Sequence, residues 1–180
     1  MDRPALPMST PAAGFSLLEL MVVLGLTLIL ATLALPSLRG LLVRWTLESE
    51  AQSLLDDLRY ARTQAIVRGQ AVSICPSVDG LGCAGQADWG RGWMIFLDAD
   101  ASRVAGAGKP VLRQHQPDPS VQTITSNGSS SRAGVTYQPT GAARAAGQSL
   151  RLTAGSSLRL VCISMQGRAA LRPQGQTQCA

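Results

Sequence analysis

Several residue types are scarce in this chain, and each scarcity narrows the functions open to it. His115 is the only histidine, so a Ser-His-Asp triad has a single imidazole to draw on. No glycine-rich phosphate loop follows an apolar strand pattern. The four cysteines show no Cys-x-x-Cys spacing, which argues against a zinc site. We therefore predict that the chain is not an enzyme and holds neither a metal nor a cofactor.

Charged and aromatic residues are also few, at 15% and 4%, whereas hydrophobic residues reach 46%. That balance excludes a disordered chain and indicates a mainly aliphatic core. The 180 residues suffice for one globular domain and an accessory segment. Acidic side chains are missing after Asp118. The last third is therefore purely cationic, which favours a polyanionic partner.

The cysteines form two pairs that are local in sequence, Cys75 with Cys83 and Cys162 with Cys179. Two disulfides fit this spacing better than a zinc site, and the alternative is four free buried thiols in a cytosolic domain. Two disulfides would place this region in an oxidising compartment. The first would close a loop, and the second would tie the C-terminal tail to the last long strand.

One apolar run, Phe15–Leu35, carries a single charge, Glu19. Its length is about that of a helix that spans a membrane, roughly 20 residues. The residues before it, 1–14, are polar and contain proline. An ordinary signal peptidase cuts after an apolar run, but here a cut fits only before it. We expect residues 15–35 to be the transmembrane or assembly half of a long helix.

Glu19 is the most informative residue, because a carboxylate near the start of an apolar helix is costly. A cut between Gly14 and Phe15 would free an amine that could neutralise it. That amine could belong to the same chain or to a neighbouring subunit, and the second arrangement would set the register of stacked helices. Alternatively, Glu19 lies at headgroup depth, where an acid suits the helix macrodipole. The residues alone leave these interpretations equal.

The segment Gly14–Val23, GFSLLELMVV, resembles the class III signal of type IV prepilins. The resemblance implies that a prepilin peptidase removes residues 1–14, taking either Met1 or Met8 as the start, and that Phe15 is then N-methylated. It also makes Glu19 the assembly residue and Pro36 the helix-bending proline. The expected partners are this peptidase, other pilins or pseudopilins, and the inner membrane.

The remaining chain predicts an α+β fold. An apolar stripe at alternating four- and three-residue steps continues the helix to residue 68, with Gly69 after its end. From Ala71 the period changes to two, so residues 69–180 should form antiparallel sheets packed on that helix. The predicted strands are Ala71–Cys75, Trp93–Leu97, Val111–Gln114, Val121–Thr125, Val135–Gln138, Ser149–Thr153 and Ser157–Ile163.

Several details of this region carry further expectations. Asp98 and Asp100 lie two apart after an apolar strand, and we interpret them as a solvated turn rather than a calcium loop or an acid/base pair. Trp89 and Trp93 are expected to pack against the loop disulfide rather than to form a stacking platform. Pro36 should bend or locally open the helix.

The residues from Ser73 to Asp98, together with Gly167-Arg168, resemble the GspH/FimT/FimU family of minor pilins and pseudopilins. The resemblance implies a structural subunit that primes or caps a type IV pilus or a type II secretion pseudopilus. The domain of residues 69–180 would be periplasmic while the chain is held in the inner membrane, and would later lie on the filament.

Two alternatives stay open beside this one: a DNA-binding minor pilin in natural transformation, and an H-type pseudopilin of protein secretion. For the first, we expect one cationic surface that attracts double-stranded DNA. In both Leu-Arg-Leu triplets of the last strands, the leucines should face the core and the arginines the solvent. Contacts to neighbouring pilins and plain solubility are the competing explanations of this surface, which comprises Arg151, Arg159, Arg168 and Arg172.

Overall fold

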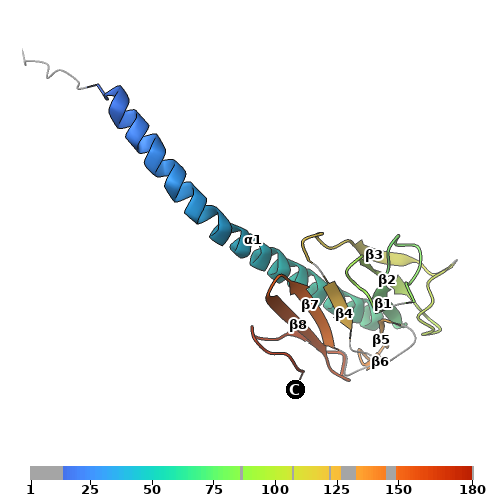
Figure 1. The fold of residues 1–180 in the computed structure, drawn as a ribbon. Coiled ribbons are helices and arrows are strands. Elements are labelled where there is room, and N and C mark those ends of the chain that lie inside the picture. The colour runs from blue at the N-terminus through green and yellow to red at the C-terminus, as the bar shows by residue number, and fades with distance from the viewer. Residues whose placement is uncertain are drawn as a thin grey trace, which may run out of the picture. The chain divides into compact units, whose positions relative to one another are not determined.

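The computed structural model describes residues 14–85, 87–106, 108–121, 123–126, 133–144 and 149–179, apart from the side chains of residues 33–37 and 39. The chain divides into two compact units, Met1–Gly40 and Leu41–Ala180. Helix α1 (Leu17–Arg68) contributes residues to both (Figure 1). All the described strands belong to the second unit, which we call the head.

Within the head, α1 buries one face as the apolar periodicity predicts. The predicted stripe is almost fully excluded from solvent, and it consists of Leu47, Ala51, Leu54, Leu58, Ala61 and Ala65. The helix ends at Arg68, and Gly69 follows with a φ of 64°, a conformation that glycine adopts without strain. Both the stripe and the helix end are thus confirmed.

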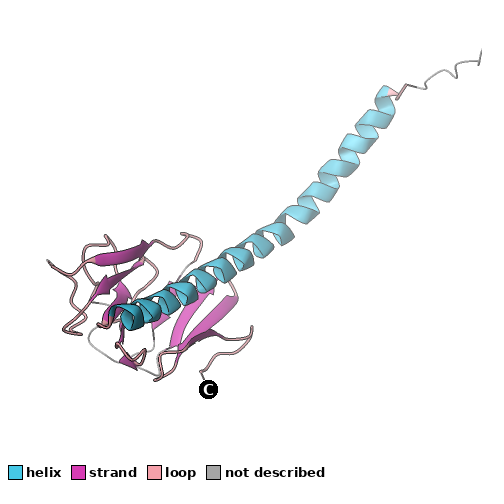
Figure 2. Ribbon diagram, turned by 180° about the vertical axis from the view of Figure 1, so that it is seen from behind, coloured by secondary structure: helices cyan, strands magenta, loops and turns pink. Residues whose placement is uncertain are grey.

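Two antiparallel sheets pack on this part of α1, and Figure 2 shows the helix crossing one side of them. The larger sheet has the order β3-β2-β1-β5-β6, with β1 (Val72–Pro76), β2 (Trp93–Leu97), β3 (Val111–His115), β5 (Val135–Tyr137) and β6 (Ala143–Arg144). The smaller has the order β4-β7-β8-β9, with β4 (Thr123–Ser126), β7 (Ser149–Ala154), β8 (Ser157–Ile163) and β9 (Ala169–Leu171).

The core divides between the two faces of the larger sheet. Val72 and Ile74 of β1 point to the helix and join the main cluster, whereas Cys75 points the other way. There Cys75 meets Met94 and Phe96 in a small second core. This alternation is the period-two geometry of a strand buried on both faces.

The α+β prediction is confirmed. Several strand ends differ from the predicted ones by one residue, and three differences are larger. The predicted strand at Val121 begins only at Thr123, because Val121 instead closes a turn by donating its N–H to the carbonyl of Asp118 over 3.0 Å. The strands β6 and β9 were missed, since two or three residues are too few to show a period of two.

Candidate assembly site

Helix α1 begins with a capped first turn. Ser16 precedes α1, and its Oγ accepts a hydrogen bond from the N–H of Glu19 over 3.1 Å. The carbonyl of Ser16 accepts the N–H of Leu20 over 3.2 Å. Ser16 with Glu19 three residues later is the Ser-x-x-Glu pattern of a capping box. This cap fixes the start of the helix at Leu17, two residues after Phe15. Phe15 is the residue that a cut after Gly14 would make N-terminal.

Glu19 lies in the first turn of α1, and its side chain is exposed. That position suits an acid, because the free N–H groups at a helix start carry partial positive charge. It also leaves the carboxylate open to an amine of the same chain or of a neighbour. Cleavage, N-methylation and pairing with an amine stay predictions for Gly14, Phe15 and Glu19.

Residues 15–32 are all exposed, and most of their side chains are apolar. Phe15 is 82% exposed, Leu17 79% and Leu30 65%. The hydroxyls of Thr27 and Thr32 donate to the carbonyls three residues before them, so they add little polarity to this surface. An apolar surface of this extent on all sides of a helix requires an apolar partner.

The structure of α1 bears on two predictions, the membrane span at residues 15–35 and the bend at Pro36. Among the described residues, no helix has a stretch long and apolar enough to cross a membrane. The helix continues through Pro36 rather than ending there. The bend itself stays a prediction.

Within the head, a polar network ties α1 to the larger sheet. The buried carboxylate of Asp57 accepts a hydrogen bond from Nε1 of Trp93 and one from Arg113, both over 2.7 Å. The Arg113 guanidinium lies 4.1 Å from the ring centre of Tyr60, a cation–π geometry. These contacts fix the sheet on the helix, and none of them was predicted from the sequence.

Trp93 stacks on His115, with ring centres 4.3 Å apart, and His115 contacts the carboxylate of Glu50 over 2.8 Å. Trp93 and Trp89 both lie in the main core beside α1. The prediction that they pack against the loop disulfide is therefore wrong. It failed because β2 turns the side chain of Trp93 to the helix and that of Met94 to the disulfide.

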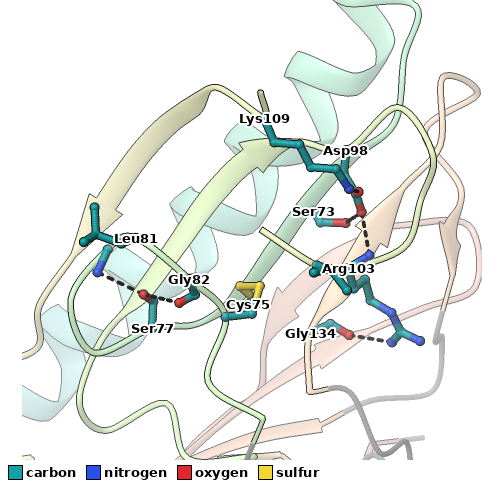
Figure 3. Close-up of a disulfide and its surroundings, with 12 residues drawn as sticks. Ser73, Cys75, Ser77, Leu81, Gly82, Asp98, Arg103, Lys109 and Gly134 are labelled. Atoms are coloured by element: carbon teal, nitrogen blue, oxygen red, sulfur yellow. Dashed lines mark hydrogen bonds and ion pairs between the residues drawn. A yellow bond between two sulfur atoms is a disulfide. The ribbon is translucent and has the colours of Figure 1, made fainter. Parts of the chain in front are cut away.

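Both predicted disulfides are present. Cys75 and Cys83 join with Cα atoms 5.6 Å apart, and Cys162 and Cys179 with Cα atoms 5.8 Å apart. The first holds the loop after β1, where Ser77 donates to the carbonyl of Gly82 over 2.6 Å (Figure 3). The second attaches the C-terminal tail to β8.

The interpretation of Asp98 as part of a solvated turn is wrong. Asp98 is fully buried at the end of β2 and accepts hydrogen bonds from four groups, some of which Figure 3 shows. The donors are the hydroxyls of Ser73 and Ser102, the N–H of Arg103 and the ammonium of Lys109. A buried carboxylate needs such partners. Asp98 thus organises the loop between β2 and β3.

Asp100 shares the same lysine. Lys109 bridges Asp98 and Asp100, with Nζ–O distances of 2.5 Å to both. The hydrogen bond from Lys109 holds the pKa of Asp100 well below its usual value. Burial lowers the pKa of Lys109, but the hydrogen bonds to Asp100 and Asp98 outweigh it and raise that pKa above its ordinary value. The loop between β2 and β3 is therefore held by a cluster of three charged groups, Asp98, Asp100 and Lys109.

The four C-terminal arginines do not share one surface. Arg151 pairs with Leu160 across β7 and β8, and Leu152 pairs with Arg159. Directly paired residues point to the same face, so Arg151 and Arg159 point to opposite faces. Arg159 faces α1 and bonds to Glu48 over 2.6 Å, with only 11% of its side chain exposed. The expectation that Arg159 faces solvent is therefore wrong, whereas Leu160 is buried as expected, on the opposite face of β8.

The other three arginines lie elsewhere. Arg151 is exposed and donates to the carbonyl of Thr177 in the tail over 3.1 Å. Arg168 is exposed on the turn between β8 and β9, and Arg172 is half-buried after β9. DNA binding stays a prediction that loses Arg159 from its set. No cluster of potential metal ligands occurs within the residues described.

The head packs on a long helix and contains two disulfides, and the start of that helix exposes apolar side chains. These features define a structural filament subunit of the pilin type. Type II transport protein GspH is the family that matches residues 50–167, and the prokaryotic N-terminal methylation motif matches residues 10–35. The chain belongs to the GspH family, whose members are minor pilins and pseudopilins and not enzymes.

Individual relatives agree with this assignment. The pilin-like protein PilA1 of Thermus thermophilus is 32% identical over 162 residues, which cover 88% of this chain and 97% of that protein. The type IV minor pilin FimU of Pseudomonas aeruginosa superposes with a TM-score of 0.58 at 26% identity, over 74% of this chain and 96% of FimU. The minor pseudopilin EpsH of the Vibrio cholerae type 2 secretion system shares the fold, with a TM-score of 0.50 at 14% identity, over 72% of this chain and 98% of EpsH.

Proposed function

We propose that the mature chain begins at Phe15 and primes or caps a type IV pilus or a type II secretion pseudopilus. A prepilin peptidase cuts between Gly14 and Phe15, and the new terminal amine is N-methylated. The helix then packs among the helices of other subunits. The observation that carries this proposal is the described start of α1, residues 17–32, which is capped, exposed on every side, apolar for most of its length, and carries one carboxylate, Glu19.

Glu19 gives the packing its register in this proposal. Once helices surround the first unit, its carboxylate lies in an apolar medium and requires a cation. The freed amine of Phe15 is the cation available at that depth, in the same subunit or in the next one. Pairing between subunits would be strongest at one axial offset, because the attraction falls with distance.

Before assembly, the same segment would lie in the inner membrane with the head in the periplasm. Two features support this route. The disulfides Cys75–Cys83 and Cys162–Cys179 require an oxidising compartment for the head. The prokaryotic N-terminal methylation motif matched at residues 10–35 supports modification of the new N-terminus.

The test is made in a bacterium that carries this chain. Mass spectrometry of the mature protein should find an N-terminal peptide that starts at N-methylated Phe15, and sheared filaments should contain the protein. Glu19→Ala should be processed but be lost from the filament fraction, because the helix then lacks its register pair. Asp79→Asn, which removes an exposed carboxylate of the head, is the matched control and should assemble normally. An intact leader, with Phe15 still bonded to Gly14, would refute the proposal.

A strain that lacks the gene for this chain distinguishes a role in a pilus from a role in secretion. Loss of twitching motility places the chain in a pilus, and loss of exoprotein release alone places it in a pseudopilus. A defect in transformation with normal motility would instead support the DNA-binding alternative.

A further inference from the structure

Arg62 of α1 holds together two turns that come from different sheets. Its Nε donates to the carbonyl of Gly141 in the turn between β5 and β6, over 3.0 Å. Its Nη2 donates to the carbonyl of Gln166 in the turn between β8 and β9, over 3.2 Å. Ala143 adds a backbone hydrogen bond to the carbonyl of Met165 over 3.1 Å. The two sheets are therefore joined here by one helix side chain and by a direct backbone hydrogen bond.

The glycines at this junction are required by close approach. Gly167 has a φ of 77°, and a Cβ at this position would overlap the carbonyl oxygen of Gly141. Gly141 has a φ of 81°, and a Cβ there would come within 2.9 Å of a methyl group of Ile66. The positive φ disfavours larger residues at both positions, and at Gly167 the backbone of Gly141 also leaves no space for a side chain. Gly167 of the Gly-Arg pair thus has a structural role.

The turn Ser164–Arg168 is also fixed from within. Gly167 donates its N–H to the carbonyl of Ser164 over 2.9 Å, and Ser164 donates to the carbonyl of Arg168 over 2.9 Å. The N–H of Arg168 donates to Oγ of Ser164 over 3.2 Å. These hydrogen bonds restrain the turn, and its large side chains Met165, Gln166 and Arg168 are exposed. Met165 is 71% exposed.

This surface has the composition of a protein interface. Met165 gains little burial within its own chain, and Ile66, which packs on Gly141, is 50% exposed. Methionine and arginine are both enriched in interface cores, and a turn restrained by its own hydrogen bonds loses little entropy on binding. A run of phosphates would require a row of free cations, but Arg62 is engaged by two carbonyls and Arg159 by Glu48. The chemistry fits one carboxylate and one apolar side chain better than a nucleic acid.

We propose that the Ser164–Arg168 turn, with Ile66, is a preformed contact surface for the head of a second filament subunit. That subunit places a carboxylate against Arg168 and an apolar or aromatic side chain against Met165. Charge complementarity supports this partner, because Arg168 is exposed and forms no ion pair with a carboxylate among the described residues of its own chain. The inference rests on the proposed function, since only a chain that enters a filament meets such a neighbour.

The experiment uses the full chain in its own bacterium, with the photo-crosslinker p-benzoylphenylalanine at position 165. The matched control carries it at Leu81, which is 76% exposed in the disulfide loop. We expect position 165 to cross-link to a protein that itself carries a methylated pilin N-terminus, and the control to do so about tenfold less. Arg168→Glu should reduce the adduct about tenfold, and Arg168→Lys should largely retain it. Changing the acid of the partner to Lys should restore the adduct in the Arg168→Glu chain.

The filament fraction separates the two ways of failing. If the protein never enters sheared filaments, the proposed function fails. If it enters them but position 165 yields no adduct, only nucleic acid, or a protein without a pilin N-terminus, the contact surface is refuted while the proposed function stands. An adduct that Arg168→Glu leaves unchanged also refutes the surface.

Discussion

Arg159 of β8 donates to Glu48 of α1 over 2.6 Å, and this pair closes the core between the helix and the smaller sheet. The arginine also donates to the carbonyl of Arg172 over 3.2 Å, so the same guanidinium holds the segment after β9. An arginine that sequence alternation assigns to solvent thus supports the packing of the head.

Removing this guanidinium should therefore cost stability. We expect Arg159→Ala to lower the free energy of unfolding by about 1–3 kcal/mol, because hydrogen bonds to charged groups are lost and Glu48 is left partly buried. Urea unfolding of the full chain in detergent would measure it. Arg168→Ala is the matched control on an exposed site and should change stability by less than about 0.5 kcal/mol. Equal losses of stability in the two variants would show that the Arg159–Glu48 pair does not stabilise the head.

Asp57 should be a second anchor of the fold. Asp57→Ala leaves the indole N–H of Trp93 without its acceptor and should cost about 2–4 kcal/mol. Asp57→Asn keeps one acceptor oxygen and should cost distinctly less. Urea unfolding followed by tryptophan fluorescence would rank the two variants. If Asp57→Asn proved as damaging as Asp57→Ala, the hydrogen bond to Trp93 would not be the main contribution.

The Lys109 cluster predicts a dependence of stability on pH. The pKa of Asp100 is lowered in the folded state, so its contribution is present above about pH 4, the unfolded pKa. The contribution is lost as the pH falls below that value. The raised pKa of Lys109 gives the opposite sign, a contribution that is lost as the pH rises beyond the usual lysine range.

Melting temperatures measured from pH 2 to 7 would check the acid side. Asp100→Asn should flatten the decline below pH 4 relative to the unchanged chain. Lys109→Gln should destabilise the head at neutral pH by about 3 kcal/mol, because Asp98 would remain as a buried charge without its cation. A decline that Asp100→Asn leaves unaltered would show that other carboxylates govern acid unfolding.

The two disulfides should differ in strength. Their sequence separations are 17 for Cys162–Cys179 and 8 for Cys75–Cys83. Loop entropy then predicts a loss of about 3 kcal/mol for the double serine variant of the longer loop, and about 0.7 kcal/mol less for the shorter. Calorimetry of the two double variants would compare them. The reverse order would indicate that packing, not loop length, decides their contribution.

The helical part of the head could be predicted because its apolar residues recur with the helical period and fit no strand. The stripe from Leu47 to Ala65 repeats with the helical period, and every member is buried. Asp57 could have been found by the same signal, since it lies three residues after Leu54 on the buried face. Its partners Trp93 and Arg113 could not, because only the folded sheet brings them to the helix.

The facing of β8 could not be predicted from alternation. Leu158-Arg159-Leu160 reads equally well in both orientations when both faces of the strand are covered. Here α1 covers the face of Arg159, whereas Leu160 on the other face is buried near the tail that Cys179 fastens to Cys162. In β7 only one face is fully covered, so Arg151 faces outward as predicted.

The side chains that attach α1 to the sheets are spaced along the helix rather than gathered at one point. Glu48 reaches β8, Glu50 and Asp57 reach β2 and β3, and Arg62 reaches two turns. A tensile load that enters along the helix axis would therefore be shared among several anchors in shear. The sheets should stay attached to α1 under such a load until more than one of these contacts has broken.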